Sequence, residues 1–424
     1  MQLYSAPPAN RKPRPMSISP PRTAVVIGGG VVGSACGLRL ADAGVAVTLI
    51  DDAPAQRPAS WGNAGHIAVE QVEPIASWAT LRSAPRRHFA RGGALDLPVA
   101  AIGAWLPFGL RLTAAATRFD AGKAALTRLM AGAMPAWRRL AKDVGDAALL
   151  REDGHFILWE TPASAAAGRA AWAATDTGTA SIRDATASEL AALRGAMGAP
   201  FAGAVRCEGS AQIADPTRLA DALAAALARA GVERRIGVAT LVRRGDRVTV
   251  AVGGERLDAD IVLVAAGIGS AALLGGIGVR VPLIAERGYH IEAATSGAML
   301  PPRVFEDRSM IVTRFGDRLR AASFVEFSRA DRPPDPRKWA RLHAHVADLG
   351  LAFEGEVTPW YGSRPTLPDY LPAIGRVAGT ANLAAAFGHN HLGLTLSAVT
   401  GDIVAALLMD GSAADSALAP SRFF

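Results

Sequence analysis

Three glycines and two aspartates near the start of the chain have the residue types and spacing of a dinucleotide-binding turn. The glycines follow an apolar run at residues 24–27 in the spacing G-x-G-x-x-G. Such a turn lets the backbone approach a pyrophosphate, and a helix that begins there offers free N–H groups and a partial positive charge. The aspartates end the next apolar run, where a carboxylate suits a ribose diol and repels a 2′-phosphate. The residues expected to bind the dinucleotide are Gly28, Gly30, Val31, Val32, Gly33, Asp51 and Asp52.

A strand–helix–strand unit must position this turn, and the hydrophobic pattern predicts one. Residues 24–27 predict a buried parallel strand, residues 31–43 have a helical period that stops at Gly44, and residues 45–50 predict a second strand. Later, the run at 260–265 enters another glycine turn, and 382–409 predicts a strand, a glycine-rich loop and a long helix. Residues 279–291 and 304–327 instead predict antiparallel strands.

Dinucleotide-domain character therefore occurs at the start, the middle and the end of the chain. We predict an α/β fold in which a Rossmann-like domain is interleaved with a second domain built on an antiparallel sheet. The Rossmann-like domain is expected at 23–95, 205–283 and 360–418, and the second domain at 96–204 and 284–359. Residues 1–22, rich in Pro, Arg and Ser, are expected to form a disordered tail.

Composition limits the other possibilities. The chain has 424 residues and a net charge of +7, yet its 45 basic residues are nearly all arginines scattered along the sequence, so we expect no nucleic-acid partner. Cys36 and Cys207 provide neither a disulfide framework nor metal spacing, and we expect no metal site. No apolar run reaches the length of a membrane span and no secretory signal is evident, which favours a cytoplasmic location. A peripheral contact with the anionic inner face of a membrane stays open.

Three further stretches, taken with the glycine turn, resemble the D-amino-acid oxidase/dehydrogenase family of FAD flavoproteins. They are SWGNAGHIA at 60–68, VLVAAG at 262–267, and the C-terminal pair GSRPTLPD at 362–369 and GHNHLGLT at 388–395. The resemblance spans about residues 22–415 in order, and the NAGH and HNHLGLT versions are most similar to bacterial D-amino-acid or D-hydroxyproline dehydrogenases. It implies a D-amino-acid oxidase-like fold whose second domain is a substrate domain, or cap.

The resemblance also implies FAD as the cofactor, and we expect it to be held without a covalent bond because Cys207 matches no attachment position. The loop at 388–395, just before the last helix, would place helix N–H groups near the flavin and stabilise the negative charge of its reduced form. The further residues implied to contact FAD are Ser60, Asn63, Ala64, Gly65, Ala265, Ala266, Gly267, Gly388, His391, Leu392, Gly393, Leu394 and Thr395.

The chemistry implied is oxidation of an amino acid, in which a hydride moves from Cα to flavin N5 and water hydrolyses the resulting imine. Arg364, in the G-x-R-P motif, would clamp the substrate carboxylate. Tyr289 is a candidate substrate contact, with a tyrosine packed in the sheet as the alternative. His66 and His389 border the two flavin loops and could bond the flavin or take the proton of the substrate ammonium.

The leading hypothesis is a D-amino-acid dehydrogenase, with D-proline and D-hydroxyproline among its candidate substrates. The electron acceptor would be a quinone, an electron-transfer partner or oxygen. One alternative is a glycine- or sarcosine-type amine oxidase that releases hydrogen peroxide. Another is a non-catalytic flavin-binding subunit of an electron-transfer complex, and Arg364 argues against it because a cofactor holder needs no carboxylate clamp.

Overall fold

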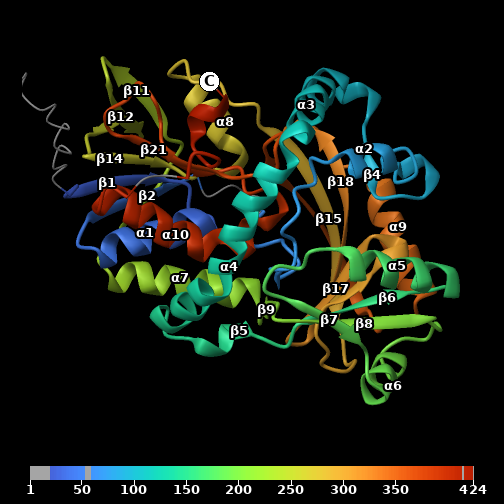
Figure 1. Cartoon of the computed structure of the whole chain (residues 1–424). Coiled ribbons are helices and arrows are strands. Elements are labelled where there is room, and N and C mark those ends of the chain that lie inside the picture. Colours follow the sequence, from blue (N-terminus) through green and yellow to red (C-terminus); the bar gives the residue numbers. More distant parts are fainter. Residues whose placement is uncertain (1–19, 53–58, 413–414, 424) are drawn as a thin grey trace, which may run out of the picture.

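Two large β-sheets lie side by side in the computed structural model, which describes residues 20–52, 59–412 and 415–423 (Figure 1). The first sheet is six-stranded, and its strands are parallel except for the last one at one edge. In spatial order it contains β10 (Glu233–Ile236), β2 (Ala46–Asp51), β1 (Thr23–Ile27), β14 (Ile261–Val264), β21 (Leu383–Phe387) and β20 (Ala373–Arg376). Residues 1–19 of the expected tail lie outside the described residues.

The centre of the parallel sheet is buried on both faces, and this explains why β1, β14 and β21 are continuous apolar runs. Along β1, Ala24 and Val26 belong to one hydrophobic core, whereas Val25 and Ile27 belong to another. Successive side chains of a strand point to opposite faces, so both faces need apolar residues. The first core is covered by helices, and the second by a small antiparallel sheet and one short helix. These elements are α1 (Val31–Asp42), α4 (Phe119–Asp143), α7 (Pro216–Arg229) and α10 (Gly393–Met409), then β11 (Thr240–Arg244), β12 (Arg247–Val252), β13 (Glu255–Leu257) and α8 (Ser270–Gly275).

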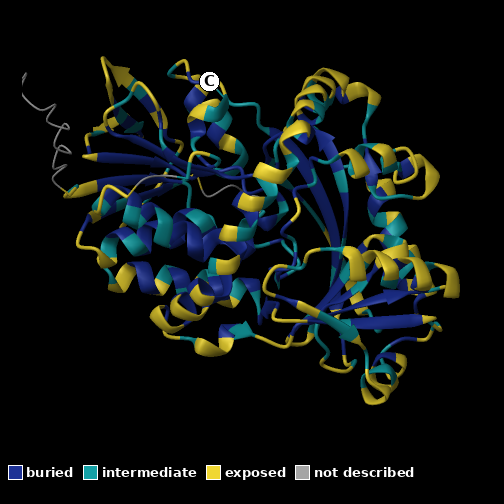
Figure 2. Ribbon diagram, viewed as in Figure 1, coloured by how far each residue is buried: buried dark blue, intermediate teal, exposed yellow. Residues whose placement is uncertain are grey.

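The second sheet is nine-stranded and mostly antiparallel, with parallel pairing of β16 to β6 and of β4 to β18. Its strands, in spatial order, are β19 (Glu354–Thr366), β15 (Ile284–Ala294), β18 (Arg318–Ser328), β17 (Met310–Phe315), β16 (Arg303–Phe305), β6 (His155–Trp159), β8 (Gly203–Glu208) and β7 (Ser181–Asp184), with β4 (Leu95–Asp96) beside β18. The remaining helices are α2 (Trp78–Ser83), α3 (Ile102–Ala115), α5 (Pro162–Ala174), α6 (Ala187–Gly195) and α9 (Pro336–Asp348). Figure 2 shows buried strands in both sheets, with exposed residues concentrated on outer helices and loops.

A three-stranded sheet of very short strands joins chain segments that are distant in sequence. It is formed by β3 (His66–Ile67), β9 (Ala211–Ile213) and β5 (Leu150–Arg151). The chain that follows β2 therefore pairs directly with the chain that leaves β8.

Several segments differ from the expected domain limits, among them β4, which the boundary between 95 and 96 divides. The boundary between 204 and 205 falls inside β8, and the one between 359 and 360 falls inside β19, so both strands belong to the large second sheet. Helix α4, expected in the second domain, packs with α10 in the first core. Hydrophobic pattern marks where strands occur, but sheet membership is decided by pairing with strands that are distant in sequence.

Two helical segments are long and apolar enough to span a membrane, by length and composition only. They are Val99–Asp143 and Asn390–Met409, which differs from the expectation that no run reaches this length. In the second, 67% of the apolar window is buried inside the protein, as expected for the core helix α10, whereas only 22% is buried in the first.

Candidate active site

A cavity of about 1340 Å³ lies between the two large sheets. Its wall combines turns at the carboxyl ends of β1, β2 and β14 with side chains from β15, β18 and β19. Binding pockets for small molecules occupy about 300–1,000 Å³, so this one has room for a large cofactor together with a substrate.

The glycine turn after β1 is shaped so that its backbone packs against β14 and α1. At Gly28, φ is +112° and a Cβ would lie 2.5 Å from the carbonyl oxygen of Ala265. At Gly33, a Cβ would lie 1.9 Å from the carbonyl oxygen of Gly28. Side chains are therefore excluded at both positions, and the backbone is left open toward the cavity.

Asp51 lies against this turn, and its predicted contact with a ribose diol stays a prediction. Its carboxylate accepts a hydrogen bond from the Gly29 N–H at 2.5 Å, which places an acidic group at the end of β2 beside the turn. The backbone geometry and the acid together fit the adenosine and pyrophosphate half of FAD. Predicted residues from this region that line the cavity are Gly28, Gly30, Val31, Val32, Asp51 and Asp52, whereas Gly33 serves the packing of α1 instead.

The NAGH loop covers the start of α1. Ser60 Oγ accepts a hydrogen bond from the Val31 N–H at 3.1 Å. Asn63 fixes the loop from within, because its side chain donates to the Ser60 carbonyl at 2.5 Å and accepts from the Gly65 N–H at 2.6 Å. Ser60, Asn63 and Ala64 line the cavity, as do Ala265, Ala266 and Gly267 after β14. Gly65, with φ +68°, packs against Phe315 and is not among the described lining residues.

The loop before α10 closes another part of the cavity with backbone and histidine groups. His391 Nε2 lies 2.7 Å from Gln71 Oε1, and Thr395 Oγ1 accepts a hydrogen bond from the Ala68 N–H at 3.0 Å. These two contacts join the loop to the chain that follows the NAGH sequence. His389, His391, Leu392, Gly393 and Leu394 line the cavity, whereas Gly388 and Thr395 are not among the described lining residues.

The first N–H groups of a helix lack partners within the helix, so the start of α10 offers hydrogen-bond donors beside the cavity. An electron-accepting flavin gains negative charge on reduction, and donors at a helix N-terminus stabilise such charge. The residues present therefore fit an isoalloxazine ring at this end of the cavity.

Arg364 lies on β19 directly opposite Glu286 on β15. Its Nη1 donates to Glu286 Oε1 at 3.2 Å and to the Phe324 carbonyl at 3.1 Å. The guanidinium lies over Gly288, where a Cβ would come within 2.3 Å of Nη2. The Arg364 side chain lines the cavity and is 27% exposed. Because both of its hydrogen bonds use Nη1, the rest of the planar guanidinium is left to face the cavity. This arrangement suits an incoming carboxylate.

Glu286 is a site residue that the sequence did not identify. It is buried, and its Oε2 accepts hydrogen bonds from Thr366 Oγ1 at 3.0 Å and Tyr370 Oη at 3.1 Å. The carboxylate thus orients Arg364 while its own oxygens are satisfied. The pairing depends on the register of two strands 78 residues apart, which no local sequence signal reports.

Tyr289 lines the cavity with its ring, but its hydroxyl belongs to a buried charge cluster. The Oη donates to Glu326 at 2.7 Å, and Lys338 Nζ lies 2.8 Å from the same carboxylate and 2.6 Å from Asp96. Burial beside Glu326 raises the pKa of the Tyr289 hydroxyl. This geometry agrees with the alternative, in which Tyr289 packs in the sheet. A contact between the substrate and the ring of Tyr289 stays a prediction.

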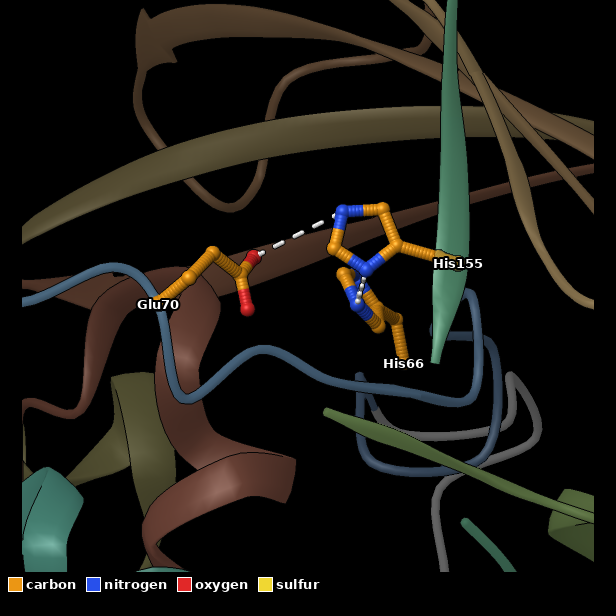
Figure 3. A group of neighbouring side chains, drawn as sticks. All are labelled: His66, Glu70 and His155. Atoms are coloured by element: carbon orange, nitrogen blue, oxygen red, sulfur yellow. Dashed lines mark hydrogen bonds and ion pairs between the residues drawn. The ribbon is translucent and has the colours of Figure 1, made fainter. Parts of the chain in front are cut away.

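His66 is part of a buried group that also contains His155 and Glu70 (Figure 3). His66 Nε2 lies 3.1 Å from His155 Nδ1, which is also 2.9 Å from Ser210 Oγ, and His155 Nε2 lies 4.0 Å from Glu70 Oε1. Glu70 Oε2 is buried without a hydrogen-bond partner among the described residues. His66, Glu70 and His155 all line the cavity, and their association could not be seen in the sequence because the three come from separate elements.

Burial sets the charge states in this group. It lowers the pKa of His66 to about 4, lowers the pKa of His155 well below its usual value, and raises the pKa of Glu70 to about 7. The three side chains offer ligand atoms within 4.8 Å of one another. His155 meets its two neighbours through different ring nitrogens: Nδ1 is within hydrogen-bond distance of His66, whereas Nε2 faces Glu70 at the longer distance of 4.0 Å.

The cavity lies between a parallel sheet of the nucleotide-binding type and an antiparallel sheet that carries a guanidinium. This combination defines a dinucleotide-dependent oxidoreductase of the flavoprotein type. Residues 23–407 match the family described as FAD dependent oxidoreductase, DAO, and the chain belongs to this family. FAD is therefore its cofactor.

Curated relatives agree with this assignment, and a solved structure has a similar fold. A D-amino acid dehydrogenase of Paramagnetospirillum magneticum is 31% identical over 91% of this chain and 94% of that protein. A D-amino-acid oxidase of Bradyrhizobium diazoefficiens is 28% identical over 94% of this chain and 97% of that protein. The crystal structure of glycine oxidase from Geobacillus kaustophilus superposes with a TM-score of 0.71 at 21% identity, covering 95% of this chain and 99% of that one.

Proposed function

We propose that the protein oxidises a D-amino acid at its Cα. The observation that carries the proposal is the Arg364 guanidinium, which Glu286 and the Phe324 carbonyl hold at the cavity into which the glycine turn also opens. An α-amino acid fits a site that holds a carboxylate while the Cα meets the cofactor. The relatives named D-amino-acid oxidase and D-amino acid dehydrogenase support the D configuration.

FAD, when bound, supplies the acceptor for the hydride that leaves Cα. The residues of the chain orient the substrate and accept the proton of its ammonium group, since the neutral amine is the reactive form. Arg364 fixes the carboxylate end. Trp360, whose ring stacks on His290 at 4.8 Å between centroids, provides an apolar wall of the cavity. That wall suits a compact ring, and we include D-proline and D-hydroxyproline among the proposed substrates.

The proton acceptor we propose is Glu70 rather than a histidine. Burial lowers the pKa of His66 to about 4 and that of His389 to about 3, so both rings are neutral and weakly basic at pH 7. His389 Nε2 is also 2.9 Å from Thr400 Oγ1. Glu70 has a pKa near 7 and an oxygen without a partner among the described residues, so it suits proton transfer near neutral pH. His66 and His389 are then neutral hydrogen-bonding groups beside the cofactor.

The experiment is an anaerobic panel of D- and L-amino acids, glycine and sarcosine, in which the flavin absorbance is followed. We expect D-amino acids to bleach the flavin and their L-enantiomers to leave it oxidised. Bleaching by L-amino acids alone contradicts the proposal, and bleaching by glycine or sarcosine with peroxide release favours the amine-oxidase alternative. No bleaching by any member favours the non-catalytic subunit. Re-oxidation of the reduced protein by a soluble quinone and by oxygen then identifies the acceptor, for which we propose a quinone.

A further inference from the structure

Helix α3 and the segment before it expose large apolar side chains that the active site does not use. Ile102, Leu106 and Leu110 are 46%, 46% and 67% exposed, and their spacing of four residues places them on one face of the helix. The opposite face of α3 buries Phe108 and Leu112 in a core shared with the α2 region. Helix α3 is thus apolar on both its covered and its uncovered face.

Two more exposed apolar residues lie in the neighbouring segments. Val99, just before α3, is 83% exposed, and Trp78 at the start of α2 is 47% exposed. Figure 1 shows α2 and α3 at the same end of the molecule, and residues from both helices pack in one hydrophobic cluster. We call this set of residues the α2–α3 surface. Its apolar members are Trp78, Val99, Ile102, Leu106 and Leu110, and its basic members are Arg82, Arg86, Arg87, Arg91, Arg111 and Arg118.

The exposed charges of this segment are of one sign. Between residues 74 and 119 the sequence contains a single acidic residue, Asp96, which is buried and paired with Lys338 at 2.6 Å. The arginines of the same segment are all exposed, and none forms an ion pair with another described residue: Arg82, Arg86, Arg87, Arg91, Arg111 and Arg118. An exposed apolar face flanked by unpaired arginines is complementary to a surface with an apolar interior and anionic groups.

The geometry excludes a membrane span by α3. Within the longer helical segment Val99–Asp143, α3 is the part that exposes Ile102, Leu106 and Leu110, and its 14 residues extend roughly 21 Å at 1.5 Å per residue, whereas a bilayer core is about 30 Å thick. Both ends are also tied to the protein, because β4 before it pairs with β18 and α4 after it packs in the first core. A helix with these constraints can lie in the interface of a bilayer but cannot cross it.

We propose that the α2–α3 surface docks the protein on an anionic lipid bilayer, with the apolar side chains in the acyl boundary and the arginines at the headgroups. Arg87, Ala94 and Leu95, from the chain between α2 and α3, line the cavity, so docking brings one wall of the active site next to the membrane. An electron acceptor dissolved in the bilayer would then reach the cavity without crossing water. The docking itself does not depend on which amino acid is the substrate.

The test is flotation of the holoenzyme with vesicles of phosphatidylcholine alone and of phosphatidylcholine mixed with phosphatidylglycerol. We expect the protein to float with the anionic vesicles and to be released by high salt. Replacing Leu106 and Leu110 together by Asp should reduce binding at least tenfold, on the order expected when two apolar side chains leave the acyl boundary. Arg82→Glu and Arg86→Glu should each weaken binding by roughly fivefold or more, which corresponds to about 1 kcal/mol per basic residue near the surface.

A matched control lies on β10, at the edge of the parallel sheet. Ile236 is 81% exposed and is not among the described residues that line the cavity, so its replacement by Asp should leave flotation unchanged. All variants should bleach with a soluble substrate at the wild-type rate. The proposal is overturned if the wild type stays with the soluble fraction on anionic vesicles, or if Leu106→Asp/Leu110→Asp floats as the wild type does. It is also overturned if sedimentation shows that these substitutions only split a dimer, because the surface is then an interface between two copies of the chain.

Discussion

The two large sheets contribute to the cavity in different ways. The parallel sheet contributes backbone: its turns at the ends of β1 and β14 meet the cavity through Gly28 and Ala265, where side chains are small or absent. The antiparallel sheet contributes side chains from the middle of its strands, among them Arg364 and Glu286. A backbone site fixes shape and accepts one cofactor, whereas a side-chain site can be altered one residue at a time. Substitutions in the first sheet should therefore remove FAD, and those in the second should change the substrate response with FAD still bound.

The largest effect is expected at Gly33 on the backbone side. In Gly33→Ala the new Cβ would lie 1.9 Å from the Gly28 carbonyl oxygen, so α1 must move away from the turn. We expect the purified protein to contain little or no FAD, measured as the ratio of flavin to protein absorbance. Gly103→Ala is the matched control, because it is also a helical glycine and its Cβ would meet no atom within 4 Å. A Gly33→Ala protein with full FAD content contradicts the backbone role.

On the side-chain side, Arg364→Ala should raise KM for the amino acid by about 100-fold, equivalent to about 3 kcal/mol, while FAD stays bound. The reason is the loss of a charge-assisted carboxylate contact. Steady-state kinetics and the flavin spectrum of the same sample measure both parts of the prediction. Arg364→Lys keeps the charge but not the planar fork, and should fall between the alanine variant and the wild type. An unchanged KM, or loss of FAD together with activity, would contradict the statement that the antiparallel sheet binds the substrate and the parallel sheet holds FAD.

A smaller effect is expected from Glu70, which lies between the two sheets. Its pKa is raised by burial from 4.5 to about 7 in the folded protein. Between these values the folded state keeps a proton that the unfolded state loses, so stability falls as pH rises from about 4.5 through about 7 and levels off above. The contribution is at most roughly 3 kcal/mol. In Glu70→Gln this pH dependence should disappear, as measured by chemical unfolding of the holoenzyme at several pH values.

Catalysis by the same variant tests the proposed proton acceptor. If Glu70 takes the ammonium proton, Glu70→Gln loses the rise of kcat/KM with pH near 7 that the wild type should show. A variant with the wild-type stability slope and the wild-type rate profile would contradict both statements about this carboxyl group.

The two sheets also differ in how far the sequence predicts them. Gly28, Gly33 and Asp51 occur within one short stretch, so their spacing alone specifies the turn that the structure shows. Glu286 meets Arg364 only through the register of β15 with β19, and Glu70 meets His155 across two elements. Such partners depend on long-range pairing, which local pattern does not encode. Arg364 was identified because it belongs to a motif. Glu286, which holds the Arg364 guanidinium, belongs to no such motif and was not identified.

The smallest effect is expected from the cysteines, and it tests how FAD is held. Cys36 and Cys207 are buried in the first core, neither is among the described residues that line the cavity, and burial raises the pKa of both thiols. A buried neutral thiol away from the cofactor cannot attach it. Acid precipitation should therefore leave the yellow colour in the supernatant, and Cys207→Ser should keep the wild-type FAD content. A yellow pellet from the wild type would show a covalent link, and its loss in Cys207→Ser would place that link on the sulfur. A yellow pellet from both proteins would point instead to Cys36 or to one of the histidines that line the cavity.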